Sequence, residues 1–391
     1  MFIKRLTLKK LLSFNDSTVE LGQLNVLIGP NAVGKSNLIE AVSLLQSAPT
    51  SMASEILRGG GIREWLWLGD RAPSPIATLE CELVPGGDRQ AGPLVYRLQF
   101  SEDAQGLVIL EERLAESGSE TDGGSGVYFE RSSLGARLGA GASGLTRESQ
   151  AVAIPRTESV LSRLKSPVDP TPITEVGSHF EQIRIFREFK TGPASQTRFG
   201  ISTSVPKESL RDGADNLAIV LHELDFLGVH DRIGKYLNRF CERFEDVKVR
   251  VGAGIAQVYL RETGLVEMLP AVRMSDGTLK FLCLLAALFH PEPPPLMCIE
   301  EPELGLHPDA LQLVAEALVE ASESMQLIVT THSDALIDSL SDRPESVLVC
   351  ERDFDNSTQF KRLSTEHLRD WLEHYSLGQL WRKGEIGGGR W

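Results

Sequence analysis

The sequence predicts an α/β fold with a mixed central sheet, an antiparallel β subdomain and an inserted region. Three observations support this prediction. A glycine-rich loop joins an apolar strand to a helix, a second apolar run ends in two acids, and a third ends in a histidine. Short apolar runs that alternate with helical segments are typical of α/β folds.

The glycine-rich loop follows the apolar run Leu24 to Ile28 and precedes a helix-like stretch, Asn37 to Leu45. It fits G-x-x-x-x-G-K-[ST], the pattern of a P-loop, whose backbone N–H groups bind phosphate oxygens. We expect Lys35 to reach the β- and γ-phosphates and the Ser36 hydroxyl to bind Mg²⁺. The expected ligand is therefore a nucleoside triphosphate. Its predicted contacts are Gly29, Pro30, Asn31, Ala32, Val33, Gly34, Lys35, Ser36 and Asn37.

Composition limits the classes of protein to which this chain can belong. Its 391 residues are 41% apolar and 24% charged, which is enough for a sizeable core in one lobed domain or two domains. A net charge of −14 argues against a surface made wholly for nucleic acid, so any DNA contact is local or made by a partner. Five cysteines without C-x-x-C spacing indicate a reduced cytosol. The longest apolar run, Phe281 to Phe289, is too short to cross a bilayer, so we expect a cytoplasmic protein with no membrane partner.

The first part of the chain has the pattern of β hairpins. Alternation through Phe2 to Leu8 and Thr18 to Leu21 predicts a small antiparallel sheet, and Ile76 to Leu83 and Leu94 to Phe100 continue it. Ser117 to Gly144 is rich in glycine, serine and alanine, which predicts loops outside the core.

Helical spacing returns from Ser209 to Phe226, where the nucleotide-binding fold resumes. We therefore predict three parts. Residues 1–85 carry the P-loop, residues 86–208 are an inserted, β-rich or flexible region, and residues 209–391 carry the remaining motifs and the tail.

The second motif is the strand Pro295 to Pro302, which ends in Glu300 and Glu301. Paired carboxylates after an apolar strand are typical of a Walker B segment. One acid holds Mg²⁺ through water, and the next orients the attacking water. We assign the metal to Glu300 and the water to Glu301. The alternative is a strand that ends in two solvated acids.

The third motif is the run Gln326 to Thr330, which is followed by Thr331 and His332. It lies one strand–helix unit after the Walker B segment, so a neighbouring strand end can place His332 near the γ-phosphate. The predicted catalytic residues are Glu301, His332 and Lys35. A single histidine at this position is alternatively structural.

Between these motifs, Ser275 and Gly277 precede the apolar helix Leu279 to Phe289. A hydroxyl, backbone donors and the positive helix end together make a second phosphate-binding surface. The alternative is a plain helix N-cap. A chain with a P-loop needs a second phosphate surface only if the two surfaces act from different subunits.

The order of the motifs resembles that of ABC-type ATPases of the SMC/RecF group, and most of all their prokaryotic predicted-ATPase relatives, which are related to the ATPase half of OLD-family nucleases. The resemblance covers the chain to about Leu45 and from about Asp212 to Cys350. It implies an ABC-ATPase head, a P-loop NTPase fold, with ATP and Mg²⁺ as ligands. It also implies a homodimer in which two heads enclose two ATP molecules.

The same resemblance implies further roles. Ser275 and Gly277 would contact the γ-phosphate of the opposite head, residues 303–307 would form the D-loop, and His332 would be the switch histidine. Glu300 stands where many such proteins have Asp, and Asp276 replaces the first glycine of the usual signature.

Two further sets of residues remain open. Lys9, Lys10 and Phe14 are candidates for the adenine or α-phosphate side, as in similar proteins, or they form a solvated strand face. Gln46 is a candidate for a glutamine that senses Mg²⁺.

For function, the resemblance implies an ATPase that controls DNA processing, repair or anti-phage defence through a separately encoded, nuclease-like effector. Two alternatives remain: a nucleotide-gated scaffold with little hydrolysis, and an ABC transporter subunit. The large interruption between P-loop and signature argues against the transporter.

Overall fold

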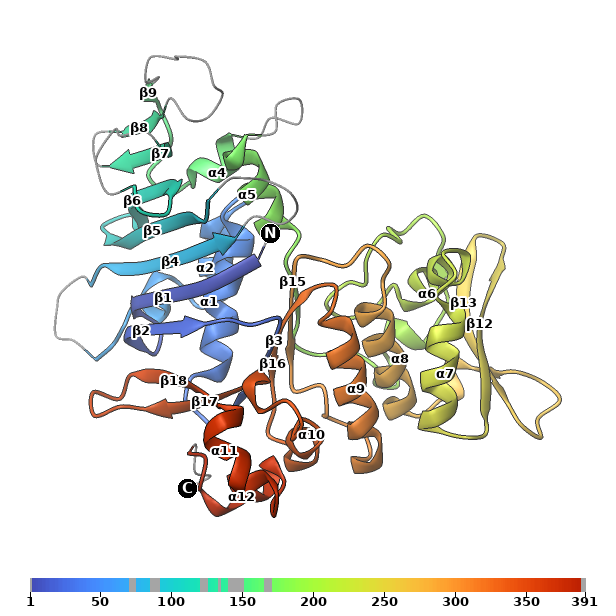
Figure 1. Cartoon of the computed structure of the whole chain (residues 1–391). Helices are drawn as coiled ribbons and strands as arrows, with labels where there is room; N and C mark the ends of the chain where they lie inside the picture. Colours follow the sequence, from blue (N-terminus) through green and yellow to red (C-terminus); the bar gives the residue numbers. More distant parts are fainter. Residues whose placement is uncertain are drawn as a thin grey trace. The chain divides into compact units, whose positions relative to one another are not determined.

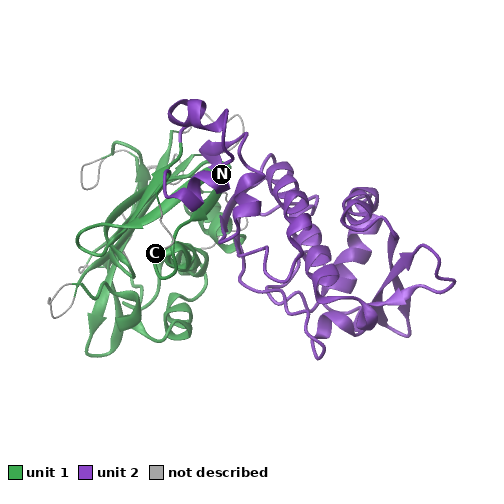
Figure 2. Ribbon diagram, turned by 90° about the horizontal axis from the view of Figure 1, so that it is seen from below, with its two compact units in different colours: residues 1–183, 347–363, 386–391 green, residues 184–346, 364–385 purple. Residues whose placement is uncertain are grey.

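The computed structural model describes residues 2–69, 75–84, 92–119, 126–132, 135–139, 151–164 and 171–387 (Figure 1). The chain forms two compact units (Figure 2). Unit 1 comprises residues 1–183, 347–363 and 386–391, and unit 2 comprises residues 184–346 and 364–385. The three-part division predicted from the sequence stays a prediction. Part of its inserted region and the tail residues 388–391 lie outside the described residues.

Unit 1 contains an 8-stranded antiparallel sheet in the order β2-β1-β4-β5-β6-β7-β8-β9. Burial alternates residue by residue along β4, as expected for a strand with one face on a core. The predicted hairpins are present, but the sheet is larger than the small one expected. The strands are β1 (Phe2–Leu11), β2 (Phe14–Glu20), β4 (Ala77–Val84), β5 (Leu94–Asp103), β6 (Gly106–Glu116), β7 (Val127–Ser132), β8 (Gly135–Leu138) and β9 (Ala151–Val152).

The prediction of loops from Ser117 to Gly144 is wrong for β7 and β8. Val127 and Phe129 are buried, and Phe129 lies opposite Leu114 of β6. Two large apolar residues at alternate positions suffice for a strand when a neighbour offers its free edge. The glycine- and serine-rich composition on either side hid this short pattern. Residues 120–125, 133–134 and 140–144 lie outside the described part of the chain.

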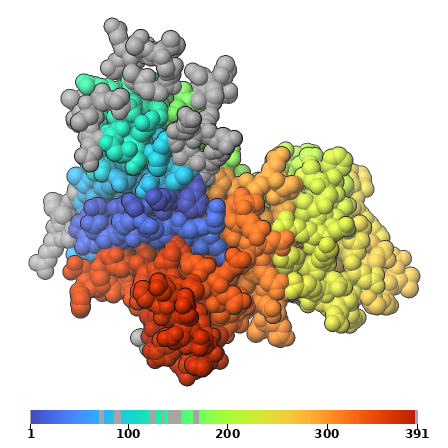
Figure 3. All heavy atoms as spheres, viewed as in Figure 1, coloured from blue at the N-terminus to red at the C-terminus, as the bar shows by residue number. Residues whose placement is uncertain are grey.

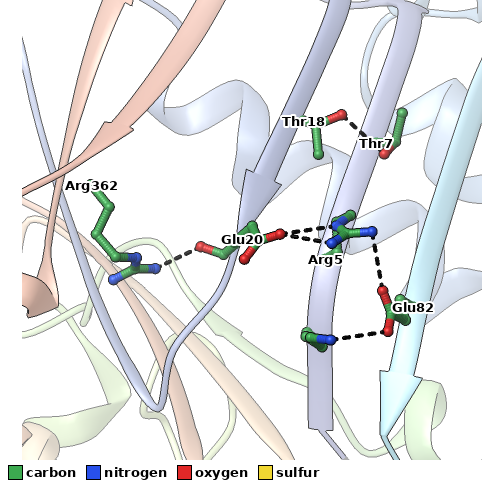
Figure 4. Close-up of polar contacts among 7 residues, drawn as sticks. Arg5, Thr7, Thr18, Glu20, Glu82 and Arg362 are labelled. Atoms are coloured by element: carbon green, nitrogen blue, oxygen red, sulfur yellow. Dashed lines mark hydrogen bonds and ion pairs between the residues drawn. The ribbon is translucent and has the colours of Figure 1, made fainter. Parts of the chain in front are cut away.

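Charged side chains cross the exposed face of β2, β1 and β4 (Figure 4). Arg5 donates to the Glu20 carboxylate at 2.8 Å and lies 3.4 Å from Glu82. The hydrogen bond with Arg5 is the main reason that the pKa of Glu20 is lowered. Arg362 also donates to the backbone carbonyl of Glu20 at 2.6 Å. Exposed pairs of this kind contribute little to stability, so they mainly favour the strand register.

The remaining strands of unit 1 come from distant parts of the sequence. β3 (Leu24–Ile28) is fully buried and pairs in parallel with β17 (Val347–Arg352), which pairs antiparallel with β18 (Thr358–Arg362). β18 also contacts β2, so a strand from the first twenty residues and a strand from the last part of the chain lie side by side in unit 1 (Figures 1 and 3). The helices of this unit are α1 (Lys35–Ser47), α2 (Met52–Arg58), α3 (Ile62–Trp65), α4 (Val160–Arg163) and α5 (Pro172–Glu181).

Unit 2 contains three parallel strands. β15 (Leu296–Glu300) lies between β10 (Arg184–Phe186) and β16 (Gln326–Thr330). The helices that follow the strands and motifs are α8 (Asp276–Leu288), which is almost entirely buried, and α9 (Leu311–Ala321), which contacts it. The short helical segments are η2 (Gln196–Arg198), η3 (Ala271–Arg273), η4 (Pro308–Ala310), η5 (Pro344–Ser346), α10 (Asp334–Asp338), α11 (Thr365–Leu372) and α12 (Leu377–Lys383).

A small antiparallel sheet completes unit 2. It consists of β11 (Ile201–Ser202), β13 (Ile255–Glu262), β12 (Phe244–Gly252) and β14 (Leu269–Pro270), and it contacts α6 (Leu217–Phe226). The helix α7 (His230–Phe240) follows α6.

The helix predicted from Ser209 begins only at Leu217, so its first part was wrong. The Asn216 side chain donates to the carbonyls of Pro206 and Ser209 and accepts from the N–H of Arg211. These bonds favour a folded loop over a helical turn.

Candidate functional site

The P-loop of unit 1 has the expected strand–loop–helix form. It leaves β3 at Gly29, and α1 begins at Lys35. Gly29 and Gly34 have φ of 149° and 105°, and Ala32 has φ of 59°. Positive φ values interspersed among ordinary ones let a loop turn its N–H groups toward one side. The Lys35 amine donates to the carbonyls of Gly29 and Pro30 at 2.8 and 2.9 Å.

The β17–β18 hairpin supports the back of this loop, which sequence reasoning missed. The Thr358 hydroxyl donates to the Val33 carbonyl at 2.6 Å, and Arg352 donates to the Ala32 carbonyl at 2.6 Å. A Cβ on Gly34 would lie 2.2 Å from the Thr358 oxygen. Gly34 is therefore required by space as well as by its φ. No sequence signal links residues more than three hundred positions apart.

Gln46 lies at the other end of α1, where its side-chain amide donates to the Ile183 carbonyl at 2.7 Å. Gln46 lies eleven positions after Lys35, which corresponds to about 16 Å along a helix axis. This distance excludes Gln46 as a ligand at the P-loop.

Phe14, a candidate for the adenine side, is fully buried and stacks on Phe360 at 5.7 Å between ring centroids. Its ring belongs to the packing between β2 and β18, so this suggestion was wrong. Lys9 pairs with Asp16 across β1 and β2 at 3.2 Å. That arrangement agrees with the alternative of a solvated strand face.

In unit 2, the two acids and the histidine lie at neighbouring strand ends. β15 and β16 run in parallel, with Glu300 opposite Thr330. Glu301 follows with φ of 45°, and its N–H donates to the Thr330 carbonyl at 3.0 Å. A left-handed backbone at a residue other than glycine costs about 1–3 kcal/mol and is concentrated at functional sites.

Glu301 and His332 face each other, with Oε1 and Nε2 3.6 Å apart, and each side chain is 34% exposed. The sequence predicted both residues, and the structure brings them together. Glu303 makes a contact that the sequence did not predict. Its carboxylate accepts hydrogen bonds from the His332 N–H at 2.8 Å and from the Thr331 hydroxyl at 2.7 Å. Burial raises the pKa of Glu303, although both hydrogen bonds act in the opposite direction.

Arg187, the first residue after β10, lies 3.4 Å from the Glu300 carboxylate. This contact was also missed, since only three residues precede Arg187 in the strand. A pocket of about 210 Å³ opens beside the two acids. Its lining includes Phe186, Arg187, Phe189, Lys280, Glu300, Glu301 and Leu304.

The segment Ser275 to Gly277, which the resemblance implies is the ABC signature, begins α8 where the sequence placed it. Ser275 is the N-cap, and its hydroxyl accepts from the Thr278 N–H at 3.1 Å. The carboxylate of Asp276, the residue that departs from the usual signature, pairs with Arg198. Arg198 is only 5% exposed and also donates to the Met274 carbonyl at 2.7 Å. The negative charge that Asp276 adds to the signature is therefore compensated by Arg198.

The signature also packs against residues 303–307, the predicted D-loop. A Cβ on Gly277 would lie 3.0 Å from the Gly305 carbonyl oxygen. Lys280, one turn further along α8, donates to the Leu304 carbonyl at 3.0 Å. The two segments are thus held as one surface within unit 2.

Ser36 in unit 1 and Glu300 in unit 2 stay the predicted Mg²⁺ ligands, and each offers oxygen, the ligand atom that Mg²⁺ prefers. Within the described part of the chain, no group of three or more His, Cys, Asp or Glu side chains is arranged to hold a metal. Among the described helices, none is long and apolar enough to span a membrane.

These features define the class of the protein, a P-loop NTPase with a mixed α/β fold. Residues 24–79 and 172–338, more than half of the chain, match the family described as "AAA domain, putative AbiEii toxin, Type IV TA system". The chain belongs to this family. No curated protein matches its sequence.

Solved structures agree on the fold. An SMC head bound to the C-terminal winged-helix domain of ScpA is 13% identical, with a TM-score of 0.58, over 94% of this chain and 99% of that one. An SMC head with an extended coiled coil, bound to the C-terminal domain of ScpA derived from Pyrococcus furiosus, is 13% identical, with a TM-score of 0.54, over 95% and 98%. The chain therefore has the fold of an SMC head, as the resemblance predicted.

Proposed function

We propose that this chain binds and hydrolyses ATP with Mg²⁺ and that ATP closes two copies into a homodimer. The observation that carries the proposal is the pair Glu301 and His332, 3.6 Å apart beside Glu300 at the ends of two parallel strands. A carboxylate that orients water and a histidine near a transferred phosphoryl group are parts that phosphoryl transfer uses.

In this proposal each residue has a defined role. The P-loop N–H groups and Lys35 bind the phosphates, and Ser36 and Glu300 hold Mg²⁺. When bound, the metal neutralises charge that develops on the phosphate oxygens. Glu301 orients the attacking water, and His332 donates a hydrogen bond to the γ-phosphate. Glu303 keeps the His332 backbone in place.

The signature supports the dimeric part of the proposal. Ser275 and Gly277 begin a helix of 13 residues, whose N-terminus favours anions. A P-loop already serves the nucleotide of its own subunit. The signature of one copy would therefore close on the γ-phosphate held by the other.

For the biological role, we propose control of a separately encoded, nuclease-like effector in DNA processing, repair or anti-phage defence. The description of the family as linked to a toxin–antitoxin system supports this direction. The net charge of −14 favours a partner, and not this chain, as the main nucleic-acid contact.

The test combines turnover with light scattering. We expect Lys35→Ala to abolish ATP binding, and Glu301→Gln to reduce turnover at least about a hundredfold while the ATP-bound dimer persists. Ser275→Arg should bind ATP as a monomer but fail to dimerise. If the Ser275 variant hydrolyses ATP normally, the two-head proposal is wrong. If the wild type dimerises with ATP but turns over little, the chain is a nucleotide-gated scaffold.

A further inference from the structure

The turn between β17 and β18 carries an exposed phenyl ring, on a hairpin whose flanking residues contact the P-loop. Phe354 is fully exposed, and among the described residues of unit 1 it is the one aromatic side chain in the exposed apolar set. The other members of that set in this unit are Leu57, Leu68 and Ile76.

The turn that carries Phe354 is well organised. The Asp353 carboxylate accepts from the N–H groups of Asp355 and Ser357, each at 2.9 Å, and from the Gln359 amide at 2.9 Å. The bond from Gln359 is the main reason that the pKa of Asp353 is lowered. An aspartate that accepts from the backbone ahead of it fixes a tight turn. The position of Phe354 is therefore set by the turn and does not depend on packing of its own ring.

The same hairpin is fixed to the P-loop. β17 and β3 run in parallel, with Val349 opposite Ile28, so the P-loop and the Phe354 turn leave the sheet at the same edge. Arg352 and Thr358 flank the turn and donate to the carbonyls of Ala32 and Val33. Both side chains bind carbonyl oxygens of the loop, so neither occupies the N–H groups that would bind phosphate.

A nucleotide bound at this loop needs a place for its base. Phe14, the ring that the sequence suggested, is buried against Phe360 and does not offer a face. We propose that Phe354 is a stacking platform for the base of the bound nucleoside triphosphate. This proposal rests on nucleotide binding at the P-loop, as proposed above.

The chemistry predicts weak base selection. Every nucleobase has a π-face, and stacking on an aromatic side chain is worth about 1–3 kcal/mol per base without reading its hydrogen-bonding edge. Phe354 should therefore strengthen binding of ATP and of GTP by similar factors. The phosphate part of the ligand should not respond to this side chain.

Calorimetric titration of the full chain with ATP and with inorganic tripolyphosphate, both with Mg²⁺, tests the proposal. We expect Phe354→Ala to weaken ATP binding about tenfold and to leave tripolyphosphate binding unchanged. Phe354→Trp should retain ATP binding, because it keeps an aromatic face. Leu57→Ala, at another exposed apolar residue of unit 1 far along the chain from the hairpin, is the control and should bind both ligands like wild type.

Three outcomes overturn the proposal. The first is unchanged ATP affinity in Phe354→Ala. The second is an equal loss for ATP and tripolyphosphate, which would show that the hairpin shapes the phosphate loop and does not contact the base. The third is normal ATP binding with loss of ATP-dependent dimerisation, which would make Phe354 a contact between copies. Failure of the wild type to bind either ligand would instead refute the proposed nucleotide function.

Discussion

Glu303 accepts a hydrogen bond from the backbone N–H of His332 at 2.8 Å, and this bond joins the predicted D-loop to the predicted switch histidine. The Thr331 hydroxyl donates to the same carboxylate oxygen, while the second oxygen is buried with no hydrogen-bond partner among the described residues. A buried oxygen without a donor is where a proton would reside. The contact therefore has a pH dependence as well as a geometric role.

The first prediction follows from the raised pKa of Glu303. The folded-state pKa of Glu303 lies above its ordinary value of 4.5, so the protonated carboxyl contributes to the free energy of unfolding. This contribution is fully present below pH 4.5 and is lost as the pH rises through the folded-state pKa. Glu303→Gln keeps both accepted bonds and cannot ionise. We expect wild type to lose stability relative to this variant as the pH rises from 4.5. Urea unfolding at a series of pH values measures the difference, with the exposed Glu323→Gln as control. A difference that does not change with pH would contradict this account.

The second prediction concerns Arg198, which bonds to the residues on which α8 begins. Arg198→Ala removes the donor to the Met274 carbonyl and the partner of Asp276, so it should destabilise the protein by about 2–4 kcal/mol. Asp276→Asn should cost less than about 1 kcal/mol, because the Asp276 side chain is 56% exposed and its pair is screened. Urea unfolding compares the two. Equal losses of unfolding free energy in the two variants would show that the ion pair, and not the bonds to the backbone, supplies the stabilisation.

The third prediction concerns Arg187, which pairs with the carboxylate proposed for Mg²⁺. Arg187→Gln frees Glu300 from a partly exposed cation, so half-saturation should need about twofold to fivefold less Mg²⁺. Titration of nucleotide binding with Mg²⁺ measures this without turnover. Arg63→Gln breaks a similar exposed pair, with Glu102 in unit 1, and is the control. An unchanged or higher Mg²⁺ requirement would mean that Arg187 does not compete with the metal.

The fourth prediction uses the close approach of Gly277 to Gly305. A methyl group at Gly277 meets the Gly305 carbonyl at 3.0 Å and must displace the predicted D-loop slightly. We expect Gly277→Ala to fold but to lower ATP turnover and ATP-dependent dimerisation at least about tenfold. Gly234→Ala, inside α7 with open space around it, is the matched control and should be neutral or stabilising by up to about 1 kcal/mol. Equal turnover in both variants would show that Gly277 takes no part in the proposed ATP-dependent dimerisation.

Local patterns made several features predictable. The P-loop, the Glu300–Glu301 strand end and the Ser275 N-cap each depend on neighbours within about ten residues, and the structure forms each of them where the sequence placed it. Their roles toward a nucleotide stay predictions. The strand β7 was missed because two alternating apolar residues are a weak signal until a neighbouring strand pairs with them.

By itself, the sequence determined the order of the motifs and the class of fold, because a strand–loop–helix pattern is encoded in consecutive residues. Only the tertiary structure decided which distant side chains support those motifs. Thr358 fills the space beside Gly34, Arg198 pairs with Asp276, and Phe14 is buried while Phe354 is exposed. These outcomes depend on chain segments that meet only after the strands pair, and their separation along the sequence carries no pattern that predicts the contact.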